Sequence, residues 1–369
     1  MREKPKILIC FGTRPEAIKM CPLIKEFYNR EGLDVKICIS GQHRHLVASV
    51  LNTYNISPDY NLDIMTENQT LFDITAGTLC EMRKILESYS PQLVIVHGDT
   101  TSALAASIAA FYSKIPSAHI EAGLRSGNVL LPFPEEFNRR AISLTASFHF
   151  APTLTARDNL IREGVDSAKI FVVGNTIVDC VQKNIDPLFK HPIITANRNK
   201  KIIFLTAHRR ENIGLPLRRI FRAVKSLALT HDDIHFIYPT HPNPAILHIV
   251  ESELRGCDSV SILPPLDGIQ CHNILSRSHV ILTDSGGLQE EGAALGIPVL
   301  VMRDSTERPE GIESGISRLV GTNTENIVAQ VENILHNSEI HDKVKSTPCP
   351  YGDGTASHKI ADIICKMLY

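Results

Sequence analysis

The sequence predicts an α/β protein built from two doubly wound, Rossmann-like domains. Short apolar runs alternate with helical patterns along the whole chain, as in parallel α/β units. The alternation lapses once, near residues 186–199, into a polar stretch with two prolines that is typical of a linker. The length of 369 residues also exceeds what a single core usually supports. We therefore expect one domain over residues 1–185 and a second over 200–354, facing each other across a central cleft.

The expected strands are apolar on both faces, as buried parallel strands are. In the first half they cover 6–11, 35–40, 93–97, 118–121, 148–151 and 170–173. Helical patterns between them cover 15–30, 71–87, 102–111 and 136–145. After the linker, strands are expected at 201–206, 235–238, 259–263, 280–283 and 298–302. Sheets of this kind bind ligands at the carboxyl ends of their strands.

Composition excludes several classes of function. The 38 Lys and Arg residues nearly balance 40 Asp and Glu residues, so no broad basic face is available for a nucleic acid polymer or an anionic membrane. The nine cysteines include no C-x-x-C pair and are expected to be reduced thiols. No apolar run approaches the ~18 residues of a membrane span, and the first is shorter than the apolar part of a signal peptide. We expect a soluble, cytoplasmic protein.

The first polar cluster follows the first strand. Gly12 at the bend and Pro15 in the first helical turn expose backbone N–H groups beside Arg14, which is typical of an anion site. A plain turn with a solvated arginine and Lys19 is an equally good interpretation of this stretch alone. The motifs of dinucleotide-binding and P-loop proteins are absent from the sequence.

Three carboxylates follow in successive loops of the first half. Asp99 and Glu121 come after neighbouring strands, and Glu135 opens a helix shortly afterwards. Carboxylates gathered at one edge of a sheet can divide acid and base duties. Helix capping would explain Asp99 or Glu135 individually. Capping explains all three less well, so we expect a catalytic cluster.

The second half offers groups suited to phosphates. His208 lies next to two arginines after the restarted first strand, a pattern that favours a phosphate pocket. A later strand runs into Ser285-Gly286-Gly287 and then a helix, where small residues let phosphates approach backbone N–H groups. Glu291, one turn on, could accept hydrogen bonds from ribose hydroxyls. Further cationic side chains follow the next strand, at Arg303 and Arg308.

With these motifs, the chain resembles the non-hydrolysing UDP-N-acetylglucosamine 2-epimerases of bacteria and archaea. The motifs of the first half are Phe11-Gly-Thr-Arg-Pro-Glu-Ala-Ile-Lys-Met20, Gly41-Gln-His43, Val96-His-Gly-Asp-Thr-Thr101, Ile120-Glu-Ala-Gly-Leu-Arg125, Pro132-Phe-Pro-Glu-Glu136 and Asn138-Arg139. Those of the second half are His208-Arg-Arg-Glu-Asn212, Asp284-Ser-Gly-Gly-Leu-Gln-Glu-Glu291, Arg303-Asp304, Thr306-Glu-Arg-Pro-Glu-Gly311 and Pro350-Tyr-Gly-Asp-Gly354. They run collinearly from residue 11 to residue 354.

The resemblance implies a glycosyltransferase-B-like fold, with UDP held mainly by the second domain and a last helix, within 355–369, packing back on the first. It implies interconversion of UDP-N-acetylglucosamine and UDP-N-acetylmannosamine, a precursor of cell-surface polysaccharide, by elimination and re-addition of UDP. Neither a cofactor nor a metal is expected. The implied partners are the two nucleotide sugars and a second copy of the chain.

The resemblance also implies residue roles. Its catalytic groups match Asp99, Glu121, Glu135 and His208, and its nucleotide-sugar contacts match Arg14, Lys19, Leu266, Cys271, Ser285, Gly286, Gly287, Glu291 and Arg308. Which carboxylate takes the proton and which returns it stays open. At Cys271 the family usually has an aromatic residue near the uracil, so a stacking contact is expected to be missing here.

Some members of the family bind a second UDP-N-acetylglucosamine as an effector. The matching residues are Gln42, His45, Asn68, Glu135, Arg209 and His241. Members with a strong effect carry Gln at position 45 and Arg at position 68. An asparagine in place of that arginine removes a positive charge and a bidentate hydrogen-bond donor, so we expect a weakened effector site.

Four alternative functions stay open. A hydrolysing epimerase would release UDP and free N-acetylmannosamine, although the loop that begins at Gly12 is typical of the non-hydrolysing group. An epimerase of a modified sugar could use the loop at 129–131 for its specificity. A glycosyltransferase would need an acceptor site, which nothing in the sequence marks. A catalytically inactive sugar-nucleotide sensor would be expected to lose a catalytic carboxylate, and all three are present.

Overall fold

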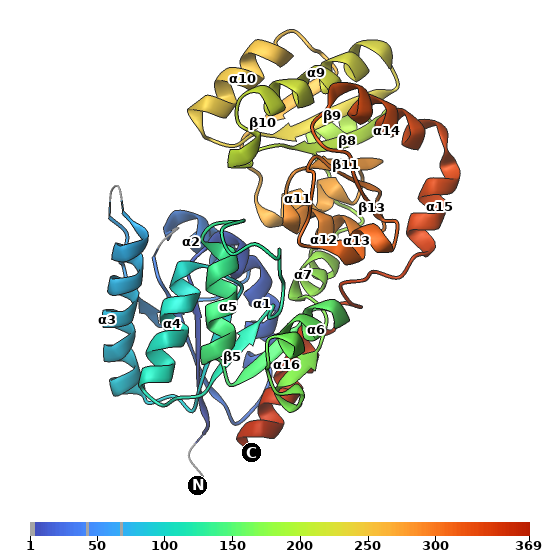
Figure 1. Ribbon diagram of the computed structural model, residues 1–369. Coiled ribbons are helices and arrows are strands. Elements are labelled where there is room, and N and C mark those ends of the chain that lie inside the picture. Colours follow the sequence, from blue (N-terminus) through green and yellow to red (C-terminus); the bar gives the residue numbers. More distant parts are fainter. Residues whose placement is uncertain (1–3, 42–43, 67–68) are drawn as a thin grey trace. The chain divides into compact units, whose positions relative to one another are not determined.

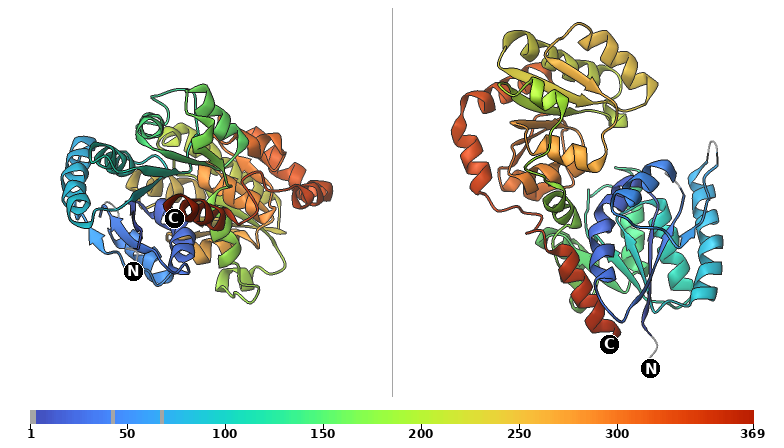
Figure 2. Two further views of the ribbon diagram at one scale, coloured as in Figure 1. Left: turned by 90° about the horizontal axis from the view of Figure 1, so that it is seen from below. Right: turned by 180° about the vertical axis from the view of Figure 1, so that it is seen from behind.

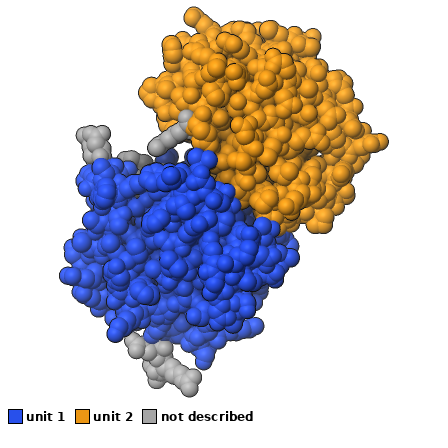
Figure 3. All heavy atoms as spheres, viewed as in Figure 1, with its two compact units in different colours: residues 1–180, 352–369 blue, residues 181–351 orange. Residues whose placement is uncertain are grey.

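The computed structural model describes residues 4–41, 44–66 and 69–369, without the side chains of Arg44, His45 and Arg210. The chain divides into two compact units, coloured separately in Figure 3. Unit 1 comprises Met1–Cys180 together with Gly352–Tyr369, and unit 2 comprises Val181–Tyr351. Each unit contains one parallel sheet between layers of helices (Figure 1). The predicted class of two doubly wound α/β units is therefore confirmed.

Within the described residues, the sheet of unit 1 has seven parallel strands in the order β3-β2-β1-β4-β5-β6-β7. The strand order reverses between β1 and β4, and ligands of doubly wound sheets bind outside the carboxyl ends of the strands at such a switch point. The strands are β1 (Lys6–Phe11), β2 (Asp34–Ile39), β3 (Tyr60–Asn61), β4 (Leu93–His97), β5 (Ser117–Ile120), β6 (Phe148–Ala151) and β7 (Ile170–Val172).

Alternate residues of β1 face opposite layers of unit 1, which explains its continuous apolar sequence. Ile7, Ile9 and Phe11 join the core formed with α1 (Arg14–Tyr28) and α16 (Ala356–Leu368), whereas Leu8 and Cys10 join the core formed with α3 (Leu71–Tyr89) and α4 (Thr101–Tyr112). The helices of unit 1 are α1 (Arg14–Tyr28), α2 (Arg44–Thr53), α3 (Leu71–Tyr89), α4 (Thr101–Tyr112), α5 (Glu135–Thr145), α6 (Leu154–Arg162), the short η1 (Ser167–Lys169) and α16 (Ala356–Leu368). Helix α7 (Thr176–Asn184) contains the boundary between the units.

The last helix, α16, packs on α1 at the opposite end of the sequence (Figures 1 and 2). Ile360, Ala361 and Ile364 are fully buried in the same core as β1. Arg30, just after α1, forms an ion pair with Asp362 of α16, with 2.7 Å between Nη1 and Oδ1. Helix α16 is therefore part of the core of unit 1, although unit 2 precedes it in the chain.

The sheet of unit 2, counted over the described residues, has six parallel strands in the order β10-β9-β8-β11-β12-β13. The order reverses between β8 and β11. The strands are β8 (Lys201–Thr206), β9 (Ile234–Pro239), β10 (Val260–Leu263), β11 (Val280–Thr283), β12 (Val299–Val301) and β13 (Ser317–Leu319). The helices are α8 (Pro192–Ala196), η2 (Arg210–Asn212), α9 (Leu215–Thr230), α10 (Pro244–Leu254), α11 (Gly268–Leu275), α12 (Gly286–Leu295), α13 (Pro309–Glu313), α14 (Thr324–His336) and α15 (Ser338–Ser346).

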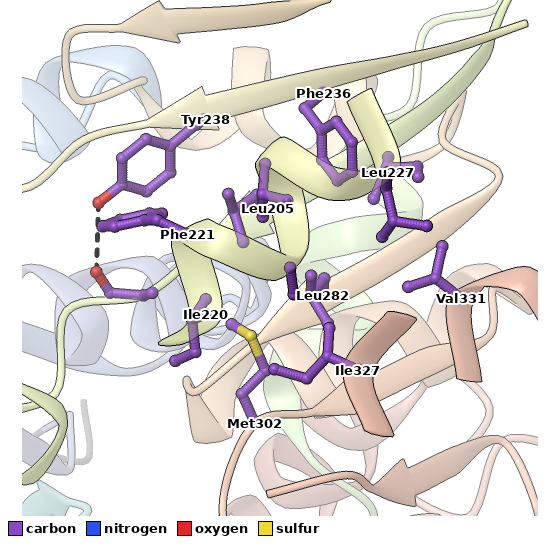
Figure 4. Close-up of a cluster of buried hydrophobic side chains, with 14 of the residues drawn as sticks. Leu205, Ile220, Phe221, Leu227, Phe236, Tyr238, Leu282, Met302, Ile327 and Val331 are labelled. Carbon is purple, nitrogen blue, oxygen red and sulfur yellow. Dashed lines mark hydrogen bonds between the residues drawn. The ribbon is translucent and has the colours of Figure 1, made fainter. Parts of the chain in front are cut away.

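One core cluster of unit 2 supports the loop that follows β8 (Figure 4). Phe221 of α9 meets the ring of Tyr238 edge-on, with 5.4 Å between ring centroids. Burial raises the pKa of Tyr238 to about 12, so its hydroxyl stays protonated. That hydroxyl donates a hydrogen bond to the carbonyl of Ala207, at 3.2 Å. The strand β9 thus supports the start of the loop that carries His208.

Most predicted strands agree with the observed ones to within one residue. Two short strands, β3 and β13, were not predicted, because runs of two or three residues carry almost no periodicity. Helix α8 lies inside the predicted linker. Pro192 occupies its first turn, and the His191 side chain accepts a hydrogen bond from the Ile193 amide, so residues that read as linker form one helical turn.

Candidate functional site

Glu121 lies at the carboxyl edge of the sheet of unit 1, immediately after β5. Its φ of 64° is in the left-handed region, which few side-chain-bearing residues occupy. Its Oε2 atom forms a buried ion pair with Lys19 and accepts a hydrogen bond from Asn175 Nδ2 at 2.9 Å. The Nε2 atom of His97, the last residue of β4, lies 3.8 Å from the same oxygen. The ion pair favours the ionised carboxylate of Glu121.

Asp99 lies two residues beyond β4, next to Glu121 along the same sheet edge. It forms an ion pair with Arg139 of α5. Asn138 donates a hydrogen bond to the Asp99 carbonyl at 2.8 Å, which fixes the backbone as well. Arg139 in turn lies 3.3 Å from Glu136 Oε2, a carboxylate with no exposed surface. The Asp99 side chain and backbone are therefore both held by α5.

The capping interpretation of the carboxylates is wrong for Asp99. The N-cap of α4 is Thr100, whose hydroxyl accepts a hydrogen bond from the Ala103 amide at 3.1 Å. The N-cap of α5 is Pro134, and Glu135 is the first residue of that helix. Within the described structure, the buried Oε2 of Glu135 has no hydrogen-bond partner. A negative charge at a helix N-terminus is favourable, so this position suits a carboxylate whether the role of Glu135 is catalytic or structural.

Glu16 was not among the predicted site residues, although it lies in the first motif. It is almost completely buried and joins two loops of the site. It accepts hydrogen bonds from the Gly12 amide at 3.0 Å, the Thr13 amide at 2.7 Å and the Thr100 hydroxyl at 2.8 Å. Burial raises its pKa, while these donors act in the opposite direction. Arg14 begins α1 directly beside this cluster.

In unit 2, His208 and Asp284 lie at the switch point between β8 and β11. Asp284 has no exposed surface, and its Oδ2 accepts hydrogen bonds from the amides of His208 and Arg209, each at 2.9 Å. The His208 side chain is 40% exposed and therefore available to a ligand. Its ring stacks on that of His241, with 5.6 Å between centroids and 7° between planes. Burial and the neighbouring His208 lower the pKa of His241.

The predicted phosphate loop forms the N-terminus of α12, with Ser285 as its N-cap. Arg308 lies against this end of the helix, because a Cβ built on Gly286 would come within 2.4 Å of its Nη1 atom. A Cβ on Gly287 would meet nothing closer than 3.7 Å. A side chain at position 286 would therefore displace the ends of Arg308 and Glu307, whereas Gly287 leaves the helix N-terminus accessible.

Three arginines converge on one buried carboxylate beside this helix. Glu307 forms ion pairs with Arg308 at 2.5 Å, Arg303 at 2.9 Å and Arg209 at 3.4 Å. Burial alone would raise the pKa of Glu307, but the three guanidinium groups hold it well below its usual range. Arg308 also pairs with Glu290 at 2.7 Å. Glu211 also lies 3.7 Å from Arg209 and 3.9 Å from Arg303, so three carboxylates balance the three arginines.

The remaining predicted contacts lie around α11 and α12. Glu291 Oε2 is 3.5 Å from Nε2 of His272, a buried residue that the sequence analysis did not identify. Cys271, on α11, and Leu266, in the loop before it, pack against the core that includes Phe204.

Of the six residues matched to an effector site, three are described with their side chains. Arg209 and His241 lie beside His208 in unit 2, where Arg209 donates to the Asp284 carbonyl at 3.0 Å. Glu135 lies in unit 1. Gln42 and Asn68 are outside the described residues, as is the side chain of His45.

The described residues contain no group of three or more His, Cys, Asp or Glu side chains placed to hold a metal ion. Over the same residues, no helix combines the length and apolarity needed to cross a membrane.

The structure adds several supporting residues to the predicted site. Arg139 and Asp284 lay within the quoted motifs but without a role, and contacts that span tens of residues cannot be read from spacing. Asn175 could have been identified from the sequence, since it follows β7 at the same sheet edge as the predicted carboxylates. Glu290 and Glu307 could not have been identified in this way, because acidic residues are not expected in a phosphate pocket until their arginine partners are known.

Comparison with known proteins agrees with this arrangement. The sequence profile described as UDP-N-acetylglucosamine 2-epimerase matches residues 25–365. The Campylobacter jejuni UDP-N-acetylglucosamine 2-epimerase is 44% identical over 374 residues, covering 98% of this chain and 97% of the relative.

Two solved structures match nearly the whole chain. The Neisseria meningitidis UDP-GlcNAc 2-epimerase bound to UDP-GlcNAc superposes with a TM-score of 0.92 at 41% identity, covering 98% of this chain and all of that one. The S. aureus MnaA–UDP co-structure gives a TM-score of 0.93 at 41% identity, covering 99% and 97%. These matches confirm the predicted glycosyltransferase-B-like fold class. With this sequence similarity over almost its full length, the chain belongs to the UDP-N-acetylglucosamine 2-epimerase family.

Proposed function

We propose that the chain is a non-hydrolysing epimerase that interconverts UDP-N-acetylglucosamine and UDP-N-acetylmannosamine by elimination and re-addition of UDP. The observation that carries the proposal is the pair of carboxylates at one sheet edge, Glu121 and Asp99, each held by its own cation. Relatives solved with UDP-GlcNAc or UDP support the substrate class.

The chemistry explains why such an enzyme needs these groups. The hydrogen on carbon 2 of the sugar is not next to a carbonyl, so its direct removal would leave an unstabilised carbanion. When the bond from carbon 1 to UDP begins to break, carbon 1 gains oxocarbenium character and the carbon 2 hydrogen becomes acidic. Removal of that proton gives a glucal-type alkene and bound UDP. Re-addition of UDP, with protonation on the opposite face, completes the inversion.

Each requirement of this route has candidate groups in the chain. Glu121, Asp99 and Glu135 are the proposed acid–base groups. His208, Arg308 and the N-terminus of α12 are proposed to stabilise the charge that develops on the leaving diphosphate. The further substrate contacts proposed are Arg14, Lys19, Leu266, Cys271, Ser285, Gly286, Gly287 and Glu291.

We also propose that units 1 and 2 act as the two domains of the enzyme, which works as a homodimer supplying N-acetylmannosamine-type precursors for polysaccharide. The oligomeric state is tested by light scattering at several protein concentrations. A constant monomer mass would contradict the dimer without affecting the catalytic proposal.

Incubation with UDP-N-acetylglucosamine in deuterium oxide, followed by NMR, tests the proposed reaction. We expect UDP-N-acetylmannosamine to appear with deuterium at carbon 2 in both the product and the recovered substrate. Free UDP and N-acetylmannosamine accumulating in proportion to turnover would establish the hydrolysing alternative instead. Epimerisation without deuterium incorporation would contradict the elimination route.

A further inference from the structure

His97 is a buried histidine whose ring lacks the usual hydrogen bonds. Its side chain is 3% exposed, and within the described structure neither ring nitrogen has a hydrogen-bond partner. A buried polar group without a partner is costly, so it needs an explanation. Burial lowers the pKa of His97 to about 4, against the smaller upward effect of Glu121, and Lys19 lowers it further. The ring is therefore neutral at physiological pH, with one nitrogen that can accept a hydrogen bond.

The backbone places this ring beside Glu121. His97 pairs with Ile120, the residue before Glu121, in the parallel register of β4 and β5. The Gly98 amide donates to the Ile120 carbonyl at 2.9 Å, which continues the ladder past the strand. The 3.8 Å between His97 Nε2 and Glu121 Oε2 is thus set by two neighbouring strands rather than by flexible loops.

The hydrogen-bond partners described for Glu121 Oε2 are donors. Lys19 offers only N–H groups. The amide of Asn175 is oriented unambiguously, because its Oδ1 accepts from the Ile177 amide at 3.1 Å and its Nδ2 therefore faces Glu121. Donors stabilise a carboxylate, but they offer nothing to the O–H of a carboxylic acid. Of these three described side chains, Lys19 and Asn175 direct donors at Glu121, whereas the neutral ring of His97 carries a nitrogen that can accept.

We propose that His97 is a positioning residue for Glu121, and that its unprotonated ring nitrogen accepts a hydrogen bond from the carboxyl once Glu121 has taken a proton from the substrate. This inference rests on the proposed function. In that step the C2–H bond breaks and its proton passes to Glu121. The electron pair of the C2–H bond forms the double bond between carbons 1 and 2. The bond from carbon 1 to UDP breaks, and both of its electrons stay with UDP. Protonation weakens the ion pair with Lys19, which lets the carboxyl turn toward His97.

The other titratable groups near His97 do not offer the same role. Lys19 cannot accept a hydrogen bond. The neighbouring His119 is itself neutral, since burial lowers its pKa to about 3, and its Nε2 lies 2.7 Å from the Gly98 carbonyl. Because a carbonyl only accepts, this nitrogen of His119 carries the hydrogen and donates a hydrogen bond to the Gly98 carbonyl.

The test compares His97→Leu, which removes the acceptor, with His97→Gln, whose amide can accept. We expect His97→Leu to lower kcat by about tenfold or more, with KM changed by less than about threefold, and His97→Gln to retain most of kcat. In His97→Leu the protonated carboxyl loses its acceptor, so the acid limb of the kcat/KM profile should move to lower pH.

His149→Leu is the matched control. His149 is another buried neutral histidine, on β6, whose charged neighbours are Arg125 and Lys169 rather than Glu121. We expect a lower Tm but an unchanged acid limb and unchanged kcat per folded molecule.

A wild-type kcat and acid limb in His97→Leu would overturn the inference, as would equal losses in His97→Leu and His149→Leu with no movement of the limb. If His97→Leu does not fold, a folded but inactive His97→Gln overturns it equally. A wild-type enzyme that does not epimerise UDP-N-acetylglucosamine would instead contradict the proposed function.

Discussion

Asp284 anchors His208 through the backbone rather than the side chain. Its Oδ2 accepts from the His208 amide at 2.9 Å, while its Oδ1 lies 3.7 Å from His208 Nδ1. The same Oδ2 accepts from Asn212 Nδ2 at 3.0 Å. The imidazole is thus left exposed for a ligand, on a loop whose backbone is hydrogen-bonded to the buried Asp284.

Asp284→Asn should therefore weaken both stability and UDP binding. The amide that replaces the carboxylate meets donor groups, so charge-assisted hydrogen bonds are lost at roughly 1.5–3 kcal/mol each. Denaturant unfolding and calorimetric titration with UDP measure the two effects. Asp166→Asn, which changes the exposed N-cap of η1 in unit 1, is the control and should leave UDP affinity unchanged. Wild-type affinity in Asp284→Asn would show that the loop keeps its shape without the charge.

Asp99→Asn, Glu121→Gln and Glu135→Gln should each lower turnover by about 100-fold or more, the scale of an acid–base group, while UDP still binds. UDP affinity, measured by calorimetry, separates this loss from misfolding. Glu87→Gln, at the exposed end of α3, should retain full turnover. Near-normal turnover in all three site variants would remove these carboxylates from the chemistry.

His208→Ala and Arg308→Ala should weaken UDP binding by the worth of a charge-assisted hydrogen bond, roughly 1.5–3 kcal/mol. Arg308→Ala should also lower Tm, because Glu290 and Glu307 lose their shared partner. Arg308→Lys keeps the charge and separates the two effects. His248→Ala, exposed on α10, serves as the control. Unchanged UDP affinity in both alanine variants would exclude a contact with the diphosphate.

Stability should decrease as the pH falls from about 7 to about 4. Burial lowers the pKa of His97 and His149 to about 4 and that of His119 to about 3, whereas an unfolded histidine titrates near 6.5. Between these values the unfolded chain binds more protons, so each histidine removes up to ~1.4 kcal/mol of unfolding free energy per pH unit of acidification. Hydrogen exchange of β4–β6 at several pH values follows this loss in unit 1. In His149→Leu, the slope of the unfolding free energy against pH should fall by an amount that corresponds to about one proton. An unchanged slope would contradict the lowered pKa of His149.

The kinetics should be nearly hyperbolic. The matched effector site has His45 and Asn68 where strongly regulated members carry Gln and Arg, and the missing contacts are worth several kcal/mol, on the order of two or three charge-assisted hydrogen bonds. Coupling cannot exceed the effector's differential affinity for the closed state. We therefore expect UDP-N-acetylmannosamine alone to be converted without a long lag. A sigmoidal rate curve, or reverse turnover that waits for added UDP-N-acetylglucosamine, would show that the effector still binds.

Periodicity predicted the strands well because each is apolar on both faces and ends at a polar loop, as β1 does at Gly12. It also placed Asp99, Glu121 and Glu135 correctly after neighbouring strands or at a helix start. It could not predict the partners of these residues. The pairing of Asp99 with Arg139 joins the loop after β4 to helix α5, and the left-handed backbone of Glu121 depends on tertiary contacts rather than on its own preference.

The position of α16 in the core of unit 1 has a consequence for synthesis on the ribosome. Domains generally fold from the N-terminus as they emerge. Here Ile360, Ala361 and Ile364 emerge only after the whole of Val181–Tyr351 has been made. Until then, the face of α1 that later receives α16 stays uncovered in nascent unit 1. Meanwhile unit 2 can form its own core. The core of unit 1 can therefore be completed only after the whole of unit 2 has been synthesised.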